Sequence, residues 1–366
     1  MTNERADQLV APSAGVLRIA SRTADLTARA IGVRQSYDLR DGQLWPVSDP
    51  VAVTGEELFD LASVTKVAAT TAVLMSLVDA GEVALDVPAR EWLPAYDSTA
   101  TVRDMLQHQS GLAEWVPTYA DPRPLTQRYP VRAGRHYSDL GFMLLADLAT
   151  AATGTPFQQL AAERVFQPLG MTGAHFRPGG RGLDGPIVAT THGDWIERTM
   201  VATGQPYPVE VEPDAFRGWR AYTLVGEVGD GNAWHARGGI AGHAGLFASA
   251  DDLVALGRGV LASLAGEGLW SPSTVDDFLT ASPDPEQAAG FRLWPVEGAA
   301  GHGGFTGTGF AVFPAIERVA VLLTNRTHTP IGTQARVARA WADILAEVGA
   351  GGAAAEAALW DWYART

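Results

Sequence analysis

The chain has 366 residues, 46% of them hydrophobic, and its 41 acidic and 27 basic residues give a formal net charge of −14. This length and composition are typical of one large domain or two lobes around a sizeable core, and exclude a mainly disordered chain. An acidic protein without a cluster of lysine and arginine would repel phosphate backbones and anionic lipid, so we expect no nucleic-acid or membrane partner. The lack of cysteine excludes disulfides, thiolate metal ligands and a cysteine nucleophile.

The first residues give an expectation about location. Up to about Ala20 they lack the basic, apolar and small-residue regions of a secretory signal, so the sequence predicts a cytoplasmic protein. The longest strongly apolar runs, such as Val67 to Val78 and Val319 to Leu323, are shorter than the roughly 20 residues that cross a bilayer.

The N-terminal part predicts a sheet edge followed by a buried helix. Short apolar runs at Gly15 to Ile19 and Leu26 to Val33 are typical of paired antiparallel strands. A loop rich in Asp, Gly and Pro follows to about Gly55. From Ser63 the chain is apolar nearly all round and ends at Gly81, a residue type that often ends a helix.

The middle of the chain predicts helices joined by turns rich in proline and glycine. They cover Thr101 to His108, Ser138 to Thr153 and Pro156 to Phe166. The stretch Arg177 to Gly231 has little periodicity, and we expect it to form a long surface loop that acts as a rim or lid.

The C-terminal part predicts helices at Asp251 to Ala265 and Thr333 to Val348, and strands at Gly309 to Pro314 and Arg318 to Thr324. Strands near both ends and a helical middle predict an α+β fold, in which an antiparallel sheet built from both termini is flanked by helices and lies beside a mainly helical lobe. We expect a single catalytic domain over 1–366, with 1–81 and 245–366 in the sheet lobe and 82–244 in the helical lobe.

The sharpest local pattern is Ser63-Val64-Thr65-Lys66 at the start of the predicted buried helix. Residues three apart share a helix face, so the Lys66 amine would lie beside the Ser63 hydroxyl and could take its proton if burial lowered the pKa of the amine. Backbone N–H groups at a helix N-terminus could also bind an oxyanion near Ser63. The alternative is a structural serine and a lysine that reaches solvent, because so short a pattern is common.

Two other patterns are weaker. Tyr137-Ser138-Asp139 could supply a proton carrier and a carboxylate that orients Lys66, but a helix N-cap explains the same residues. The glycines around His302 in Gly301-His302-Gly303-Gly304 would let a ligand approach the backbone, and His302 could assist proton transfer. A hairpin turn is the alternative, and the glycine spacing matches no phosphate-binding loop.

Taken together, the three patterns resemble the serine beta-lactamase and penicillin-binding-protein-like superfamily over most of the chain. LFDLASVTK resembles its S-x-x-K box, YSD its Y-x-N box with aspartate in place of asparagine, and HGG its K/H-T/S-G box. TVRDMLQHQSGL and GEVGDGNAWHARGGIAGHAGLFASADDL resemble two further segments of one branch, the class C beta-lactamase-related serine hydrolases, and an esterase-like member is favoured.

The resemblance implies a beta-lactamase/transpeptidase-like fold and a role for each matched residue. Ser63 would be the acylated nucleophile and Lys66 its base, while Tyr137 would protonate the leaving group or activate the deacylating water. The backbone N–H groups of Ser63 and Phe305 would form the oxyanion hole. The candidate catalytic residues are therefore Ser63, Lys66, Tyr137, Asp139 and His302, and the candidate substrate contacts are Gly303, Gly304 and Trp219.

Two departures from the family pattern bear on the substrate. Gly303 replaces a hydroxyl that helps other members bind a substrate carboxylate, and His302 replaces a lysine. Loss of such a charge-assisted hydrogen bond would weaken binding of an anionic acyl donor by roughly 1 to 3 kcal/mol, which favours neutral esters or amides. Asp139 in place of asparagine would keep Lys66 protonated, and Tyr137 could then share the role of base.

The remaining polar and aromatic residues point to structure rather than chemistry. We expect His108 and His243 to make structural hydrogen bonds to backbone in glycine-rich turns. Asp230, Asn232 and His235 could coordinate a cation or line the cleft, but even with His192 and Asp194 they match no zinc spacing, so we expect no metal and no cofactor. The aromatic residues of the long loop are predicted to form a hydrophobic cleft wall: Trp195, Tyr207, Phe216, Trp219 and Tyr222.

The first hypothesis is a serine hydrolase that acts on small-molecule esters or amides through an acyl-enzyme at Ser63. The alternative within the same mechanism is a beta-lactamase or D-Ala-D-Ala carboxypeptidase, which would take a beta-lactam or a peptidoglycan-type substrate and against which the missing export signal counts. A hypothesis of another class is a non-catalytic ligand-binding member, and the intact Ser63, Lys66 and Tyr137 argue against it. The sequence does not determine the oligomeric state.

Overall fold

The computed structural model describes residues 11–121, 123, 125–176, 186–331, 333, 337–348 and 355. Its main sheet has six strands in the order β10-β11-β12-β13-β1-β2, and every neighbouring pair is antiparallel. The N-terminal strands are β1 (Ala14–Ser21) and β2 (Asp25–Gly32). The C-terminal strands are β10 (Arg292–Leu293), β11 (Ala300–Gly303), β12 (Gly309–Phe313) and β13 (Arg318–Thr324). The predicted α+β fold, with a sheet built from both ends of the chain, is confirmed.

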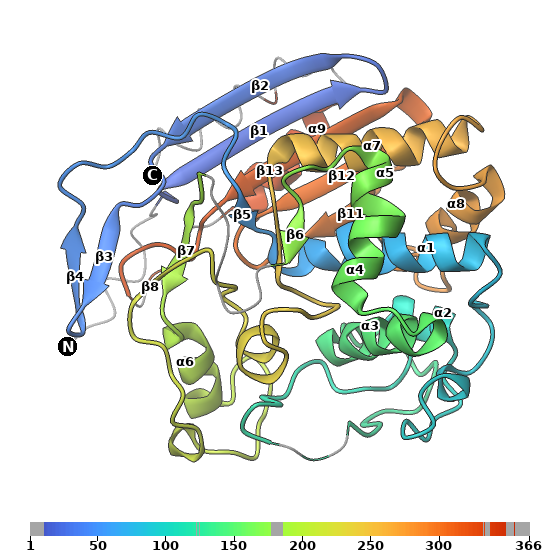
Figure 1. The fold of residues 1–366 in the computed structure, drawn as a ribbon, viewed down its shortest axis with the longest axis horizontal. Helices are drawn as coiled ribbons and strands as arrows, with labels where there is room; N and C mark the ends of the chain where they lie inside the picture. Colours follow the sequence, from blue (N-terminus) through green and yellow to red (C-terminus); the bar gives the residue numbers. More distant parts are fainter. Residues whose placement is uncertain are drawn as a thin grey trace.

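Helices cover both faces of this sheet (Figure 1). On one face, α9 (Ala338–Val348) packs Ile344 and Leu345 against side chains of β1 and β13, such as Leu17 and Leu322. On the other, α7 (Ala250–Leu264) contacts β1 and β13 beside the predicted buried helix. The N-terminus of α7 has a capping box, because the Ser249 hydroxyl accepts from the Asp252 N–H and the Asp252 carboxylate accepts from the Ser249 N–H.

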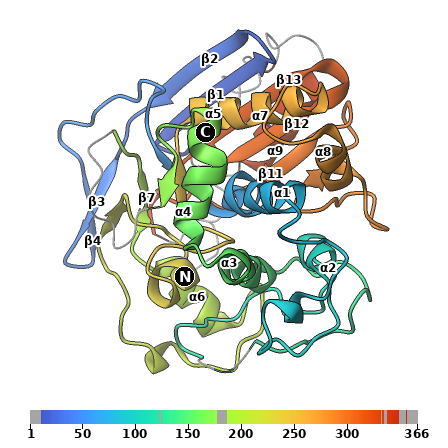
Figure 2. The ribbon, with the colours of Figure 1, turned by 45° about the vertical axis from the view of Figure 1, so that its right-hand side comes forward.

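The buried helix is continuous from Ala62 to Asp79. It begins as a 3-10 turn, η1 (Ala62–Val64), widens into a π-helical segment, η2 (Lys66–Thr71), and continues as α1 (Ala72–Asp79). Its length and apolarity would suffice to cross a membrane, yet 83% of these 18 residues are buried inside the protein, as in the core helix of a globular domain. Both ribbon views place α1 between the main sheet and α3 (Asp139–Thr153) (Figures 1 and 2).

The helical region contains more regular structure than the sequence predicts. Its other helices are short: η3 (Ala89–Glu91), α2 (Val102–Leu106), α4 (Phe157–Ala161), η4 (Ala162–Phe166), α5 (Gln167–Leu169), η6 (Pro213–Ala215) and η7 (Asn232–Ala236). The C-terminal region adds α8 (Pro272–Leu279) and η8 (Pro314–Ile316). The small sheets are β3 (Tyr37–Arg40) with β4 (Gln43–Pro46), and β5 (Phe59–Asp60) with β9 (Leu246–Ala248) and β6 (His175–Phe176).

The expectation of a long irregular loop at Arg177 to Gly231 is wrong for its described part. That part contains β7 (Ala189–His192), α6 (Trp195–Thr203) and β8 (Thr223–Val225), and β7 pairs with β8. Short elements separated by glycine and proline leave too little periodicity to detect in a sequence. Residues 177–185 lie outside the described residues, and the lid role stays a prediction.

Candidate active site

Ser63 lies in the first turn of the buried helix, directly after β5, and the backbone there is strained. The preceding residue, Ala62, has a φ of 45°, a conformation that costs a non-glycine residue roughly 1 to 2 kcal/mol. Asp60 stabilises the turn, because its Oδ1 accepts a hydrogen bond from the Ala62 N–H at 2.9 Å. Backbone strain of this kind is typical of functional sites, where it fixes the direction of a side chain.

Lys66 is fully buried and its ammonium has three oxygen partners. Its Nζ donates to Ser63 Oγ at 2.8 Å, to Asp139 Oδ1 at 2.6 Å and to the His243 carbonyl oxygen at 3.3 Å. Burial alone would lower the pKa of Lys66, but the charge and hydrogen bond of Asp139 outweigh it and raise the pKa above its ordinary value. The structure therefore holds Lys66 as a cation at neutral pH.

The segment before α3 brings Tyr137 and Asp139 to Lys66. The N-cap is Ser138, whose hydroxyl accepts from the Gly141 N–H at 3.2 Å, so the N-cap interpretation is correct for this residue. Its two neighbours are free for the site, and the Tyr137 ring centre lies 4.9 Å from Lys66 Nζ. Burial raises the pKa of the Tyr137 hydroxyl, which Lys66 only partly offsets. Tyr137 is therefore a neutral phenol at pH 7.

The strand β11 forms the opposite wall of the site. His302 is buried, its ring centre is 5.9 Å from that of Tyr137, and its Nδ1 lies 2.7 Å from the Gly303 carbonyl oxygen. Burial and the charge of Lys66 lower the pKa of His302 to about 3, so this histidine is neutral at physiological pH. A Cβ at Gly304 would clash with the Thr308 hydroxyl and the Leu61 carbonyl oxygen, whereas one at Gly303 would meet nothing closer than 4.0 Å.

The backbone N–H groups of Ser63 and Phe305 are available to an oxyanion. In the part of the chain that the structure describes, neither donates a hydrogen bond. Both residues line the same cavity, while the Phe305 side chain packs under the Arg326 guanidinium at 4.8 Å. The oxyanion hole expected from the family resemblance therefore has free donors.

A cavity of about 350 Å³ opens on Ser63. Among the candidate site residues, its lining includes Ser63, Tyr137, Asp139, Gly303, Gly304 and Phe305, but not His302, Trp219 or Lys66, which lies behind Ser63. The Trp219 indole instead packs against Tyr119 and Phe216 and donates to the Pro213 carbonyl oxygen. Of the loop aromatics, only Tyr207 belongs to the described wall, and Trp115, which follows the TVRDMLQHQSGL segment, also lines it without having been predicted.

His108 and the polar residues between Asp194 and His243 form hydrogen bonds or ion pairs within the protein. His108 Nδ1 accepts from the Ser138 N–H, so the prediction of a structural bond to backbone is confirmed. The same prediction for His243 is wrong, because its Nε2 pairs with Asp230 Oδ1 at 2.9 Å. Asp194 pairs with both Arg220, at 2.6 Å, and His235, at 2.9 Å.

Asn232 is a structural residue rather than a ligand. Its side chain bonds the Thr118 N–H and hydroxyl and the Val116 carbonyl oxygen. Among the described residues, no group of three or more His, Asp or Glu side chains is arranged to hold a metal ion.

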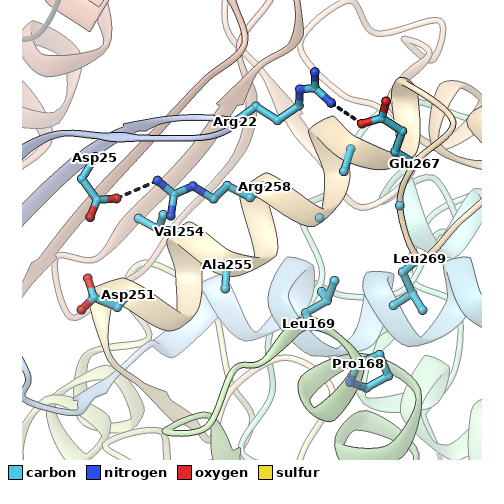
Figure 3. Close-up of a pocket in the computed structure, with 13 residues that line it drawn as sticks. Arg22, Asp25, Pro168, Leu169, Asp251, Val254, Ala255, Arg258, Glu267 and Leu269 are labelled. Carbon is cyan, nitrogen blue, oxygen red and sulfur yellow. Dashed lines mark hydrogen bonds and ion pairs between the residues drawn. The ribbon is translucent and has the colours of Figure 1, made fainter.

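A second groove, along α7, lacks a candidate nucleophile and base (Figure 3). The guanidinium groups there are paired across it, Arg22 with Glu267 at 2.6 Å and Arg258 with Asp25 at 2.7 Å. Among the described residues that line this groove there is no serine, tyrosine or lysine. The cavity at Ser63 is therefore the candidate active site.

The fold and the paired Ser63 and Lys66 define a serine hydrolase. The chain belongs to the beta-lactamase family, since the family model for beta-lactamase matches residues 29–343. The superfamily expected from the motifs is thus confirmed.

Relatives with similar sequences include proteins named as an amidase and as a putative carboxypeptidase. An N-acetylmuramyl-L-alanine amidase of Bacillus subtilis is 31% identical over 77% of this chain and 71% of its own length. A putative D-alanyl-D-alanine carboxypeptidase of Escherichia coli K12 is 28% identical over 83% of this chain and 76% of its own. The octameric penicillin-binding protein homologue of Pyrococcus abyssi has a similar structure, with a TM-score of 0.64, 17% identity, and coverage of 87% of this chain and 71% of that one.

Proposed function

We propose that this protein hydrolyses esters or small amides through an acyl-enzyme formed on Ser63. The observation that carries the proposal is the 2.8 Å contact between Lys66 Nζ and Ser63 Oγ, in the wall of a cavity that also presents two free backbone N–H groups. A nucleophile, a proton carrier and an oxyanion hole are the three parts that acyl transfer requires.

The proton path must account for a cationic Lys66. As Ser63 Oγ forms a bond to the carbonyl carbon, Lys66 takes the hydroxyl proton and passes one of its own to Asp139, which lies 2.6 Å away. The N–H groups of Ser63 and Phe305 hold the oxyanion. When the bond to the leaving group breaks, the Tyr137 hydroxyl protonates that group and is itself reprotonated through Lys66.

Deacylation repeats these steps with water in place of serine. Water adds to the acyl carbon and gives its proton to Tyr137, which passes its own hydroxyl proton through Lys66 to Asp139. The bond to Ser63 Oγ then breaks, the serine recovers its proton, and the acid leaves. Lys66 thus acts as the general base only in concert with Asp139, and Tyr137 shares the role.

The site favours substrates without a carboxylate, which is why we prefer esters. Gly303 has no hydroxyl, and His302 is neutral rather than cationic. The hydroxyls of Thr306 and Thr308, the nearest ones in the sequence, donate to the Asp60 and Leu61 carbonyl oxygens instead.

A second candidate is hydrolysis of an amide bond in a peptidoglycan fragment. The names of the relatives from B. subtilis and E. coli favour it. A beta-lactam would be a substrate of the same mechanism, with a carboxylate that the site must then bind by other groups.

The test is the intact mass of the protein after incubation with a short p-nitrophenyl ester, a muramyl-peptide amide or a penicillin, for wild type and Ser63→Ala. We expect turnover or an adduct with the ester that is absent from Ser63→Ala. Acylation by the penicillin would contradict the argument from Gly303, and turnover of the amide alone would favour the second candidate. Binding without any adduct or turnover would support a non-catalytic role instead.

A further inference from the structure

The cavity behind Ser63 is strongly acidic. Among its described lining residues there is no lysine, arginine or histidine, but five carboxylates: Asp60, Asp139, Asp194, Glu197 and Asp230. Lys66 neutralises Asp139, and Arg220 neutralises Asp194. In the described part of the chain, none of the other three pairs with a lysine or arginine.

These three carboxylates accept hydrogen bonds from neutral donors, and Asp60 and Glu197 are buried while the Asp230 side chain is 21% exposed. Asp60 Oδ2 accepts from the Gly229 N–H at 2.7 Å, and Glu197 accepts from the Gly231 N–H at 3.0 Å and the Tyr119 hydroxyl at 2.9 Å. Asp230 has only His243 as a possible cation.

The carboxylates also repel one another. Burial and the charge of Asp230 raise the pKa of Asp60 to about 6 and that of Glu197 to about 8. At pH 7 Asp60 and Asp230 therefore carry negative charge that no described lysine or arginine side chain pairs with, whereas Glu197 holds its proton. A bound cation would balance this charge and favour loss of the Glu197 proton.

Two hydroxyls in the same wall have no partner of their own. Thr190 and Thr191 of β7 are each 3% exposed, both line the cavity, and neither Oγ1 forms a hydrogen bond in the described part of the protein. Buried hydroxyls are normally satisfied, so these two mark the place of a polar ligand. A primary ammonium has three N–H donors and no acceptor, which suits carboxylate and hydroxyl oxygens together.

We propose that the acyl group of the substrate carries a primary ammonium, bound between Asp60, Glu197 and Asp230, so that the enzyme hydrolyses aminoacyl esters or amides. This inference rests on the proposed acylation of Ser63 and specifies its substrate class. Because Asp60 Oδ1 bonds the N–H of Ala62, next to the nucleophile, a cation near Asp60 lies close to the scissile carbonyl. An α- or β-amino group reaches that position.

The test compares two ethyl esters of the same shape, alanine ethyl ester and ethyl isobutyrate, in which an ammonium replaces a methyl group. Both alanine enantiomers are used, and acid release is followed at pH 7. We expect wild type to show a kcat/KM, divided by the rate constant for alkaline hydrolysis of the same ester, about tenfold or more higher for at least one alanine ester. Asp230→Asn and Glu197→Gln should each lower this ratio several-fold, while Glu91→Gln, which removes an exposed carboxylate away from the cavity, should leave it unchanged.

The outcomes separate this inference from the proposed function. Turnover of both esters with a ratio near or below one overturns the ammonium site and leaves acylation of Ser63 standing. No turnover of any ester, with no mass adduct on Ser63 from a p-nitrophenyl ester, overturns both. The wild-type ratio alone decides the matter if a variant fails to fold.

Discussion

Lys66 Nζ and Asp139 Oδ1 are 2.6 Å apart, and the Lys66 side chain is completely buried. The same ammonium contacts the Ser63 hydroxyl, so the residue that must accept the serine proton is held as a cation by its neighbour. Asp139 therefore controls the pH at which the proposed nucleophile can be activated.

Replacing Asp139 by asparagine tests this control. In the proposed mechanism Asp139 takes a proton from Lys66, and its loss also lowers the pKa of Lys66, so kcat/KM of Asp139→Asn should fall several-fold at pH 7 and rise towards pH 10 as neutral Lys66 forms. The measurement is ester hydrolysis by wild type and Asp139→Asn between pH 5 and 10. Asp147→Asn, also on α3 but paired with Arg237, is the control and should keep the wild-type profile. A pH profile of Asp139→Asn identical to that of wild type would mean that Asp139 takes no proton from Lys66.

Restoring a hydroxyl at position 303 should restore binding of a carboxylate. The space there is open, so Gly303→Thr fits without displacing a neighbour, whereas Gly304→Thr would clash. We expect Gly303→Thr to increase the rate of acylation by penicillin several-fold relative to a neutral p-nitrophenyl ester. Equal changes for both substrates would show that the hydroxyl does not contact a carboxylate. Thermal melting of both variants checks the steric argument, since only the position 304 variant should lose stability.

Glu197 makes the protein less stable as the pH rises. Its folded pKa of about 8 is above the ordinary value of 4.5, so the folded state holds a proton that the unfolded state has lost between these values. The contribution of Glu197 to the free energy of unfolding therefore falls as the pH rises from 4.5 to about 8, by about 1.4 kcal/mol for each unit of pKa difference. Outside this range its contribution does not change with pH. Glu197→Gln should therefore gain stability relative to wild type between pH 5 and pH 8.5 in urea unfolding. A constant difference between the two proteins across this range would contradict the raised pKa.

The sequence predicts the strands around this site and its Ser63 and Lys66 pair better than it predicts the other residues that line the cavity. The two-stranded N-terminal edge and the strands β12 and β13 have clear apolar patterns, and Ser63 and Lys66 are fixed by a local helical spacing. The carboxylate cavity was not predicted as a binding site, because Asp60 and Glu197 are 137 positions apart in the chain. Only the folded chain brings them together. Trp219 was expected at the site because composition reveals an aromatic loop but not which ring faces the cavity.

Arg220 should contribute strongly to the free energy of unfolding, although it lies outside the cavity lining. It forms a buried ion pair with Asp194, with side-chain exposures of 4% and 1%, and removing one partner of such a pair leaves an uncompensated charge. We expect Arg220→Met to lower the free energy of unfolding by about 3 to 5 kcal/mol. Arg237→Met breaks a more exposed pair with Asp147 and should cost about 1 kcal/mol or less. Urea unfolding of the two variants measures the difference, and equal losses would show that His235 and the backbone compensate Asp194 without the arginine.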